Sequence, residues 1–297
     1  MSTVMEPAAA DGRAHAPARW RGALAATSRR HPVARRAAST VLPLVALVLV
    51  WQLVTEVWLT QARVFPPPGD VWNALLDLIK GKGAVSGSYG NALATFKRIV
   101  IAFVLSFAVG ASLGILAGRK RAVFELVSNP LWVAMAVPSV VWAFIFVVIL
   151  GTGDAVPIAA LMALLVPNVL ITVAEGTKGL SKDLLEMANS YGATATQKVR
   201  DVYLPQLVPY FFASARVAFS LAIKISVIAE VIGVQKGIGY ELDSWYTRTL
   251  IAPVIAWGVV LTGAGLAVDF LMFRPLERRL DRWRIAGHER EIAQEVI

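Results

Sequence analysis

The clearest potential for chemistry lies in three ionisable side chains, Arg216, Lys224 and Glu230, within one otherwise apolar run over residues 207–232. An ionised group at membrane depth costs at least ~2.5 kcal/mol unless it is paired or hydrated, and it commonly faces a bundle interior or a wet path. At about 100° per residue, Arg216 and Glu230 lie within about 40° of each other on a helix, and Lys224 is turned roughly 80° from Arg216. We predict that this helix lines a polar path and that these three residues face it.

Two interpretations of Lys224 stay open at this stage. In the first, its ammonium group lines the path and attracts an anion. In the second, it forms an ion pair with Glu230 or Asp269, or extends its charged end toward the membrane surface, and only stabilises the helix bundle. Glu230 lies close to the outer end of the run, where water could hydrate it.

Other reactive residue types are absent or lie in the tails. The sequence contains no cysteine, which excludes disulfides, thiol chemistry and Cys-bound metals. Its histidines, His15, His31 and His288, all lie in polar terminal segments, so no histidine-based catalytic or metal site can be assembled. A Gly-rich loop ending in Gly-Lys-Ser/Thr is also missing, so we expect no ATP site of that kind. We therefore expect a chain that is not an enzyme and holds no cofactor or metal.

The composition predicts an integral membrane protein. Of 297 residues, 57% are hydrophobic and only 16% are charged, and the mean hydropathy is +0.61; soluble domains carry about 25% charged residues. Six apolar runs each approach the ~20 residues that cross a bilayer, and a backbone in hydrocarbon must form helices to satisfy its own hydrogen bonds. We predict an all-α fold with six transmembrane helices, over approximately residues 41–59, 99–118, 131–150, 155–174, 207–232 and 251–273.

The distribution of positive charge predicts the orientation of these helices. The net charge is +9, and with both ends of the chain inside, the inner segments hold 20 Lys and Arg residues against 5 in the outer segments. Cytoplasmic loops collect Lys and Arg, so we place both termini in the cytoplasm and expect no nucleic-acid partner. We divide the chain into a disordered basic tail (1–39), a membrane domain (40–284) and a C-terminal tail (285–297). An organelle transit peptide is the alternative interpretation of the N-terminal basic tail.

Smaller patterns predict how the helices are arranged. A Pro-rich turn at residues 65–69 precedes a short amphipathic helix with Val71, Leu75, Leu78 and Ile79 on one face, and a flexible loop follows over residues 81–90. A ridge of glycines at every fourth position predicts a close helix–helix contact through Gly110, Gly114 and Gly118. Prolines at three positions predict bends or helix ends at Pro138, Pro157 and Pro167.

A polar, helix-prone stretch, residues 184–205, separates two of the long apolar runs. Its apolar residues have the spacing of one helix face, Gly192 interrupts it where a helix could turn, and Leu204-Pro205 opens the next helix. The stretch therefore predicts a short helical hairpin beside the membrane, with an apolar face formed by Leu184, Met187, Ala188, Tyr191 and Ala195.

This stretch resembles the cytoplasmic signature of permease subunits of bacterial binding-protein-dependent ABC importers. The signature reads Glu-Ala-Ala, three residues, Gly, nine residues, Ile, one residue, Leu-Pro. The chain has Glu186-Met187-Ala188, then Gly192, then Val202 and Leu204-Pro205, with every interval kept. Met187 and Val202 depart from it but stay apolar.

Two further segments are similar to the subgroup that carries nitrate, sulfonates, taurine and related compounds. Ala229-Glu230 and Gly237-Ile238-Gly239-Tyr240 match its Ala-Glu and Gly-Ile/Leu-Gly-Tyr segment, and residues 187–193 match its Met-Ala-Arg-Ser-Tyr-Gly-Ala except at Asn189. Leu150-Gly151 departs from the usual aromatic-Gly pair.

The resemblance implies a permease that carries a small anion across a bacterial inner membrane, as a homodimer in lipid, with an ABC ATPase subunit and an extracytoplasmic solute-binding protein as partners. The binding protein would dock on outer loops near residues 60–90 and 233–249. The alternative is an ion-coupled secondary transporter or channel, although no inverted repeat is evident. The residues expected to couple the permease to the ATPase are Glu186, Met187, Ala188, Tyr191, Gly192, Leu204 and Pro205.

Overall fold

The computed structural model describes residues 32–57, 65–81 and 88–279. The chain divides into two compact units, Met1–Trp58 and Leu59–Ile297. In the first unit, helix α2 (Pro32–Val57) contains the apolar segment Val45–Val57, which covers much of the first predicted span. Helix α2 begins within the predicted basic tail, and the rest of that tail lies outside the described residues.

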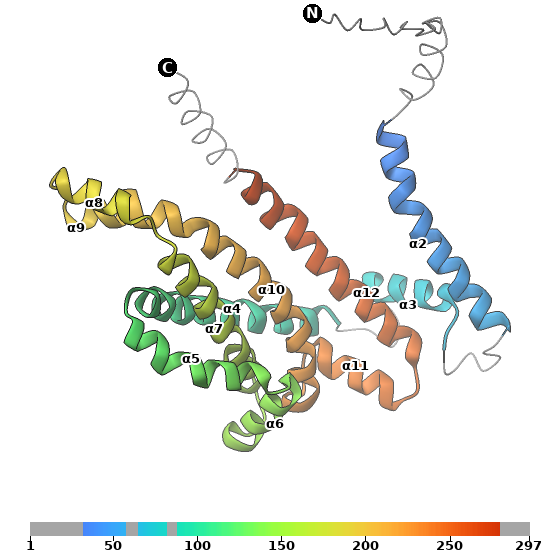
Figure 1. The fold of residues 1–297 in the computed structure, drawn as a ribbon. Helices are drawn as coiled ribbons and strands as arrows, with labels where there is room; N and C mark the ends of the chain where they lie inside the picture. The colour runs from blue at the N-terminus through green and yellow to red at the C-terminus, as the bar shows by residue number, and fades with distance from the viewer. Residues whose placement is uncertain (1–31, 58–64, 82–87, 280–297) are drawn as a thin grey trace, which may run out of the picture. The chain divides into compact units, whose positions relative to one another are not determined.

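The regular secondary structure in the described part of the second unit is entirely helical, which confirms the predicted all-α class (Figure 1). Its chain order places α8 and α9 at the start of α10 and α11 after its end. The elements are α3 (Pro68–Lys80), α4 (Ser88–Arg119), α5 (Arg121–Ala136), α6 (Ser139–Leu150), α7 (Ala155–Lys178), α8 (Lys182–Ser190), α9 (Ala195–Gln197), the π-helix η2 (Lys198–Tyr203), α10 (Leu204–Gly233), α11 (Ile238–Thr247), α12 (Ile251–Val268) and the π-helix η3 (Asp269–Phe273).

Several of these helices are long and apolar enough to cross a membrane. Among the described residues, three continuous helices meet that criterion: Ser88–Arg119, Ala155–Lys178 and Ile251–Arg279. Two further pairs meet it together but are bent, by 100° between α5 and α6 and by 61° between α10 and α11. The structure therefore contains up to five candidate spans, with the shorter apolar segment of α2 in addition.

The third predicted span is a broken helix, which corrects the expectation of one helix over residues 131–150. Val137 has an extended backbone conformation (φ −69°, ψ 125°) and Pro138 directly precedes α6. Proline disfavours the helical conformation in the residue before it, so the chain leaves the helix at this point. Helix α4 also begins earlier than predicted, at Ser88, so the end of the predicted 81–90 loop is helical.

The glycine ridge on α4 forms a close contact with α7, as predicted. A Cβ atom added at Gly110 would lie 2.8 Å from the Val169 Cβ atom, and one at Gly118 would lie 2.5 Å from the Thr177 Cβ atom. Helix α7 is the most deeply buried element, with Leu161, Leu165 and other side chains fully enclosed. Helix α10 packs on this α4–α7 pair through Ala218 and Ala222, which fixes the rotation of α10 about its axis.

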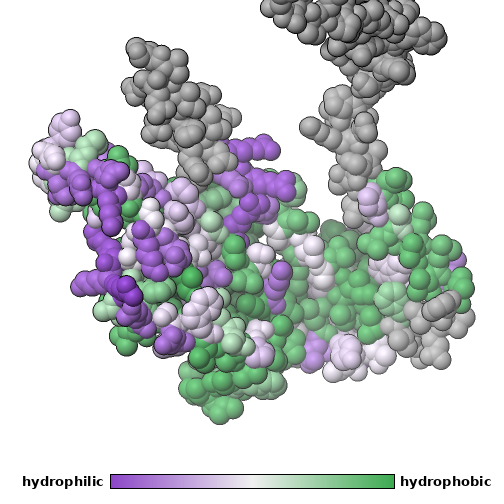
Figure 2. All heavy atoms as spheres, viewed as in Figure 1, coloured by the Kyte–Doolittle hydropathy of each residue, from purple (hydrophilic) through white to green (hydrophobic). Residues whose placement is uncertain are grey.

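The surface of the second unit has distinct polar and apolar regions. In Figure 2, hydrophilic side chains gather over the end that contains α8 and α9, whereas the surface around α6 is strongly hydrophobic. Many large apolar side chains on the helices are exposed, including Leu105, Phe144 and Val148. Such a surface is stable in contact with lipid or another apolar partner.

Candidate functional site

The predicted hairpin forms, and Gly192 closes its first helix. Gly192 has a left-handed backbone conformation (φ +68°). Its N–H group donates to the Asn189 carbonyl at 3.0 Å, and the Ala193 N–H group donates to the Ala188 carbonyl at 2.9 Å. These two bonds form a Schellman motif, which ends a helix by satisfying its last carbonyl groups. Glycine adopts this conformation at no steric cost, which gives the residue its structural role here.

The second half of the hairpin is fixed by side chains at both of its ends. The Thr194 hydroxyl accepts from the Gln197 N–H group, and the Gln197 side chain accepts from the Thr194 N–H group, which forms a capping box. Gln206, in the first turn of α10, accepts from the Ser181 N–H group at 3.0 Å, so the two ends of the hairpin are joined. The π-helix η2 then leads directly into α10, so no loop separates the hairpin from α10.

The hairpin leaves most of its predicted docking residues on the surface. The exposed fractions are 52% for Met187, 85% for Tyr191 and 47% for Leu204, and Glu186 is also exposed. Ala188 is the exception, because only 8% of it is exposed and it packs inside the hairpin. Its predicted place on a docking face is therefore corrected: Ala188 supports the hairpin, and its neighbours form the free surface.

A groove of about 520 Å³ lies between α10, α12 and η3 and brings together two of the predicted path residues. Arg216 and Lys224 both line it, with Ser220 between them on α10. Apart from the ionisable pair Arg216 and Asp269, its walls are mainly apolar; they include Phe219, Ile223, Val227, Leu261, Leu266 and Phe273. The groove therefore offers a charged site within apolar surroundings.

Arg216 is held by carboxylates on the neighbouring helix. Its Nε and Nη2 atoms donate to the two oxygens of Asp269 at 2.8 and 3.1 Å, and its Nη1 atom donates to Glu277 at 2.8 Å. Arg274 also donates to Asp269. A bidentate arginine–carboxylate pair fixes the geometry of both groups. Arg216 thus joins α10 to the α12–η3 helix.

Lys224 is different, because it forms no ion pair or hydrogen bond with any described residue of the chain. Asp269 lines the same groove but is bound to Arg216 and Arg274, and Glu230 is bound elsewhere. The pairing of Lys224 with Glu230 or Asp269, one of the two interpretations drawn from the sequence, is therefore wrong. Its ammonium group is exposed at the groove.

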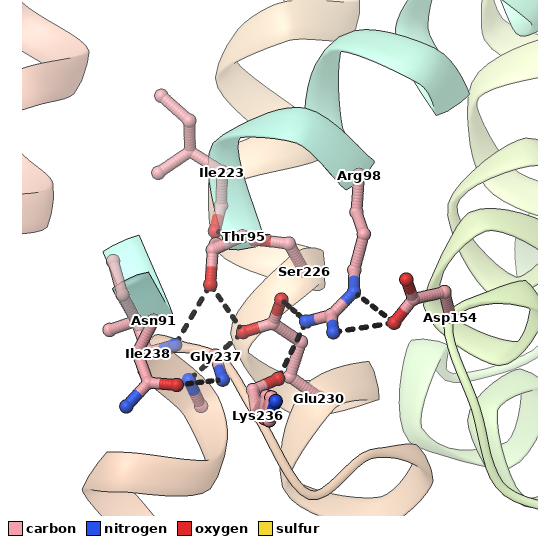
Figure 3. Close-up of polar contacts among 11 residues, drawn as sticks. Asn91, Thr95, Arg98, Asp154, Ile223, Ser226, Glu230, Lys236, Gly237 and Ile238 are labelled. Atoms are coloured by element: carbon pink, nitrogen blue, oxygen red, sulfur yellow. Dashed lines mark hydrogen bonds and ion pairs between the residues drawn. The ribbon is translucent and has the colours of Figure 1, made fainter. Parts of the chain in front are cut away.

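Glu230 does not line this groove, which corrects its predicted place beside Arg216 and Lys224. It is fully buried and accepts from Arg98 Nη1 at 2.6 Å and from the Thr95 hydroxyl at 2.7 Å (Figure 3). Arg216 and Glu230 share a helix direction, but fourteen residues of helix separate them by about 21 Å along the axis. The two side chains therefore lie at different depths.

The carboxylate of Glu230 is part of a buried cap on helix α11. Three successive N–H groups at the start of α11 donate to side chains of other helices: Gly237 to Asn91 at 3.0 Å, Ile238 to Thr95 at 2.8 Å and Gly239 to Glu230 at 3.0 Å. The first N–H groups of a helix have no partner within it, and its positive end favours a carboxylate.

Arg98 completes this cluster and joins it to a further helix. It donates to Glu230, to the Lys236 carbonyl at 2.7 Å and to Asp154 at 2.6 and 3.0 Å, just before α7 (Figure 3). Sequence reasoning missed Arg98, although Asn91, Thr95 and Arg98 have the three- and four-residue spacing of one helix face. That polar face at the start of α4 was the available signal.

No cluster of three or more His, Cys, Asp or Glu side chains that could hold a metal ion occurs within residues 32–57, 65–81 and 88–279. The described side chains provide a cation without a protein partner at the groove, an exposed surface on the hairpin and a continuous helical connection between the hairpin and α10. They define a helical membrane protein whose polar hairpin continues directly into the helix that lines its groove.

Comparison with known families agrees with that class. Residues 110–282 match the family described as binding-protein-dependent transport system inner membrane component, and the chain belongs to this family. The match covers the α4 glycine ridge, the hairpin, the groove and the Glu230 carboxylate.

Curated relatives extend over most of the chain. It is 25% identical to the taurine transport system permease protein TauC of Escherichia coli K12, over 86% of this chain and 92% of the relative. It is 25% identical to the putative aliphatic sulfonates transport permease protein SsuC of Bacillus subtilis 168 (80% of this chain and 84% of the relative). It is 23% identical to the nitrate import permease protein NrtB of Leptolyngbya laminosa (80% of this chain and 86% of the relative). Among solved structures, an inward-facing MetNI methionine ABC transporter aligns with 80% of this chain and 97% of its own, at 19% identity and a TM-score of 0.44.

Proposed function

We propose that this chain is the permease subunit of an ATP-driven importer and that the hairpin over residues 182–203 is the site where an ABC ATPase subunit docks. The single observation that carries the proposal is the hairpin itself: it is rigidly closed by Gly192, exposes Met187 and Tyr191, and continues into α10. Family membership supports it, as do relatives that are named permeases.

The proposed cargo is a small anion, which an extracytoplasmic solute-binding protein delivers. Relatives are named for taurine, aliphatic sulfonates and nitrate. In the chain itself, the groove beside α10 carries a lysine without a carboxylate partner among the described residues.

A second copy of the chain would cover part of the exposed apolar surface, and lipid would cover the rest. ATP hydrolysis takes place on the docked subunit in this scheme, and the hairpin lies on the cytoplasmic side of a bacterial inner membrane, as do both termini.

Coupling follows from the direct connection between the hairpin and α10. When the ATPase subunits close, they move the hairpin as a rigid body, and α10 tilts with it because only η2 lies between them. The buried face of α10 slides on α4 and α7, and the groove beside α10 opens to one side of the membrane or to the other. Glu186, exposed beside Met187, supplies a charged contact to the ATPase.

Replacement of Gly192 tests this proposal. Gly192→Val places a β-branched side chain at φ +68°, which costs about 1–2 kcal/mol or more and disrupts the Schellman motif. Co-expressed with an ABC ATPase subunit that co-purifies with the parent chain, the variant should insert in the membrane but lose ATPase co-purification and vanadate-sensitive uptake. Gly192→Asn is the matched control, because asparagine tolerates this conformation; it should retain both.

Normal co-purification and uptake with Gly192→Val would contradict the coupling role of the hairpin. Uptake that a protonophore abolishes but vanadate leaves intact would contradict an ATP-driven importer and favour an ion-coupled carrier instead.

A further inference from the structure

The groove between α10 and α12 contains two polar groups without protein partners. Among the described residues, neither the Lys224 ammonium nor the Ser220 hydroxyl forms a hydrogen bond or an ion pair. They are one helical turn apart on α10, line the same groove and are both exposed. Residues four apart lie on the same helix face, so both groups can reach one ligand.

The carboxylate that could neutralise Lys224 is already bound. Asp269 lies in the same groove, but Arg216 holds both of its oxygens and Arg274 adds a further bond. Arg216 has Glu277 as a second partner. Of the three ionisable residues that line the groove, Lys224 alone carries a charge that the described chain leaves unbalanced. A charge in a membrane-spanning helix is retained where it meets a wet path, an opposite charge or a ligand.

Most of the remaining walls of the groove are apolar, and the hydroxyl of Thr262, which also lines it, donates to the Gly258 carbonyl. Phe219, Ile223 and Val227 line it from α10, and Leu261 and Leu266 line it from α12. The volume of about 520 Å³ is within the range of small-molecule pockets and well above the size of a three-oxygen inorganic anion. An inorganic anion would use the lysine but leave the apolar walls without contacts.

We propose, on the basis of the proposed importer function, that Lys224 and Ser220 form a binding site in the permease for organic anions with a sulfonate or carboxylate head and a short apolar body. Lys224 and Ser220 hold the head, and the apolar walls hold the body. Arg216 and Asp269 neutralise each other at the far end of the groove and stabilise the two helices, so they do not select the ligand. Lys224 thereby distinguishes organic anions from neutral solutes, and the walls distinguish them from nitrate or bicarbonate.

Alkanesulfonate binding to the purified permease tests this site directly. The full chain in phosphatidylcholine nanodiscs, which carry no anionic lipid, is titrated with methane-, propane- and butane-1-sulfonate and with sodium nitrate. We expect affinity to rise about fourfold for each added methylene, as burial of apolar surface requires, and nitrate to bind far more weakly than butane-1-sulfonate. Lys224→Met should weaken butane-1-sulfonate binding at least about tenfold, because it removes a charge-assisted hydrogen bond, and Lys224→Arg should retain most of it.

Stability measurements separate ligand binding from a structural role. Because Lys224 forms no bond in the described chain, Lys224→Met should unfold at the same temperature as the parent or higher. The contrasting variant, Arg216→Met, should unfold at a clearly lower temperature, because it removes the bond to Glu277 and leaves Asp269 with Arg274 alone.

Several results would overturn the proposal. They are equal butane-1-sulfonate binding by parent and Lys224→Met, equal binding of nitrate and butane-1-sulfonate, or a change from dimer to monomer in Lys224→Met, which would assign the lysine to a subunit interface. ATPase co-purification with the parent chain separates the failure of this site from the failure of the proposed importer function. If the ATPase co-purifies but sulfonate does not bind, only the proposed binding site is wrong. If the ATPase does not co-purify with the parent chain, the importer assignment is wrong.

Discussion

At the scale of single residues, the ionisable groups of the membrane region fall into two classes. Arg98, Glu230, Arg216 and Asp269 are bound by groups of opposite charge and by hydrogen bonds. Lys224 is not, within the part of the chain that the structure describes. A bound charge contributes to the geometry of the bundle, whereas an unbound charge beside an open groove is available to a solute. We propose that this difference, and not position along α10, separates structural from functional roles here.

The buried pair of Arg98 and Glu230 should be among the most sensitive positions of the fold. Arg98→Met leaves the fully buried carboxylate without its cation, and breaking a buried pair on one side costs about 3–5 kcal/mol. We expect a strongly lowered unfolding temperature in detergent micelles, measured by intrinsic fluorescence. Adding Glu230→Gln should recover part of the loss, because the amide oxygen can still accept from Thr95 and Gly239.

An exposed arginine provides the control for this comparison. Arg121 pairs with Glu125 on the surface, with side chains 92% and 61% exposed. Exposed pairs of this kind contribute at most about 1 kcal/mol, so Arg121→Met should change the unfolding temperature little. Equal losses for Arg98→Met and Arg121→Met would mean that the buried cluster does not stabilise the fold.

At the scale of helices, local sequence patterns predicted the features that depend on residues close together in the chain. The apolar runs, the glycine ridge and the Gly192 turn each depend on residues within a few turns of one another. The structure contains the ridge and the turn, and helices cover the described part of the runs, although the run over residues 131–150 is broken at Pro138. The Arg98–Glu230 pair could not be found in this way, because its partners are 132 residues apart and only the fold brings them together. The angular estimate for Glu230 failed for a related reason: a helix face indicates direction but not depth.

Close packing of α4 against α7 gives a prediction at this scale. A Cβ atom at Gly114 would lie 2.8 Å from the Leu170 carbonyl oxygen, which belongs to the backbone and cannot rotate away. Gly114→Ala should therefore separate the two helices and destabilise the protein by about 1–3 kcal/mol, as overpacking does. Its unfolding temperature should fall below that of the parent chain.

A second helical glycine shows whether the loss of stability comes from the α4–α7 contact or from the replacement of any helical glycine by alanine. Gly263 on α12 has open space where a Cβ would lie. Gly263→Ala should be neutral or slightly stabilising, because alanine favours a helix by about 0.5–1 kcal/mol over glycine. If both alanine variants were equally stable, the α4–α7 contact would tolerate a side chain and the ridge would have no packing role.

At the scale of the whole molecule, the hairpin and the buried cap are connected to opposite ends of α10. The hairpin precedes Leu204 through η2, and the cap on α11 holds Glu230 three residues before the end of the helix. Helix α10 therefore links the proposed docking surface to a fixed turn, with the groove between them. Movement imposed at the hairpin is expected to act on the groove because the far end of the helix is anchored.

The orientation of this arrangement in the membrane can be measured because the chain contains no cysteine, so a single introduced thiol is the only labelling site. Tyr191 in the hairpin and Tyr246 in α11 are 85% and 67% exposed, so replacing either should leave the fold intact. The excess of Lys and Arg in the inner segments predicts that Tyr191→Cys reacts with a membrane-impermeant maleimide only in inside-out vesicles and Tyr246→Cys only in right-side-out vesicles.

The opposite pattern would place the hairpin outside the cell, away from ATP, and would contradict its role as an ATPase docking site. Reaction of both thiols from the same side would mean that α10 does not cross the membrane.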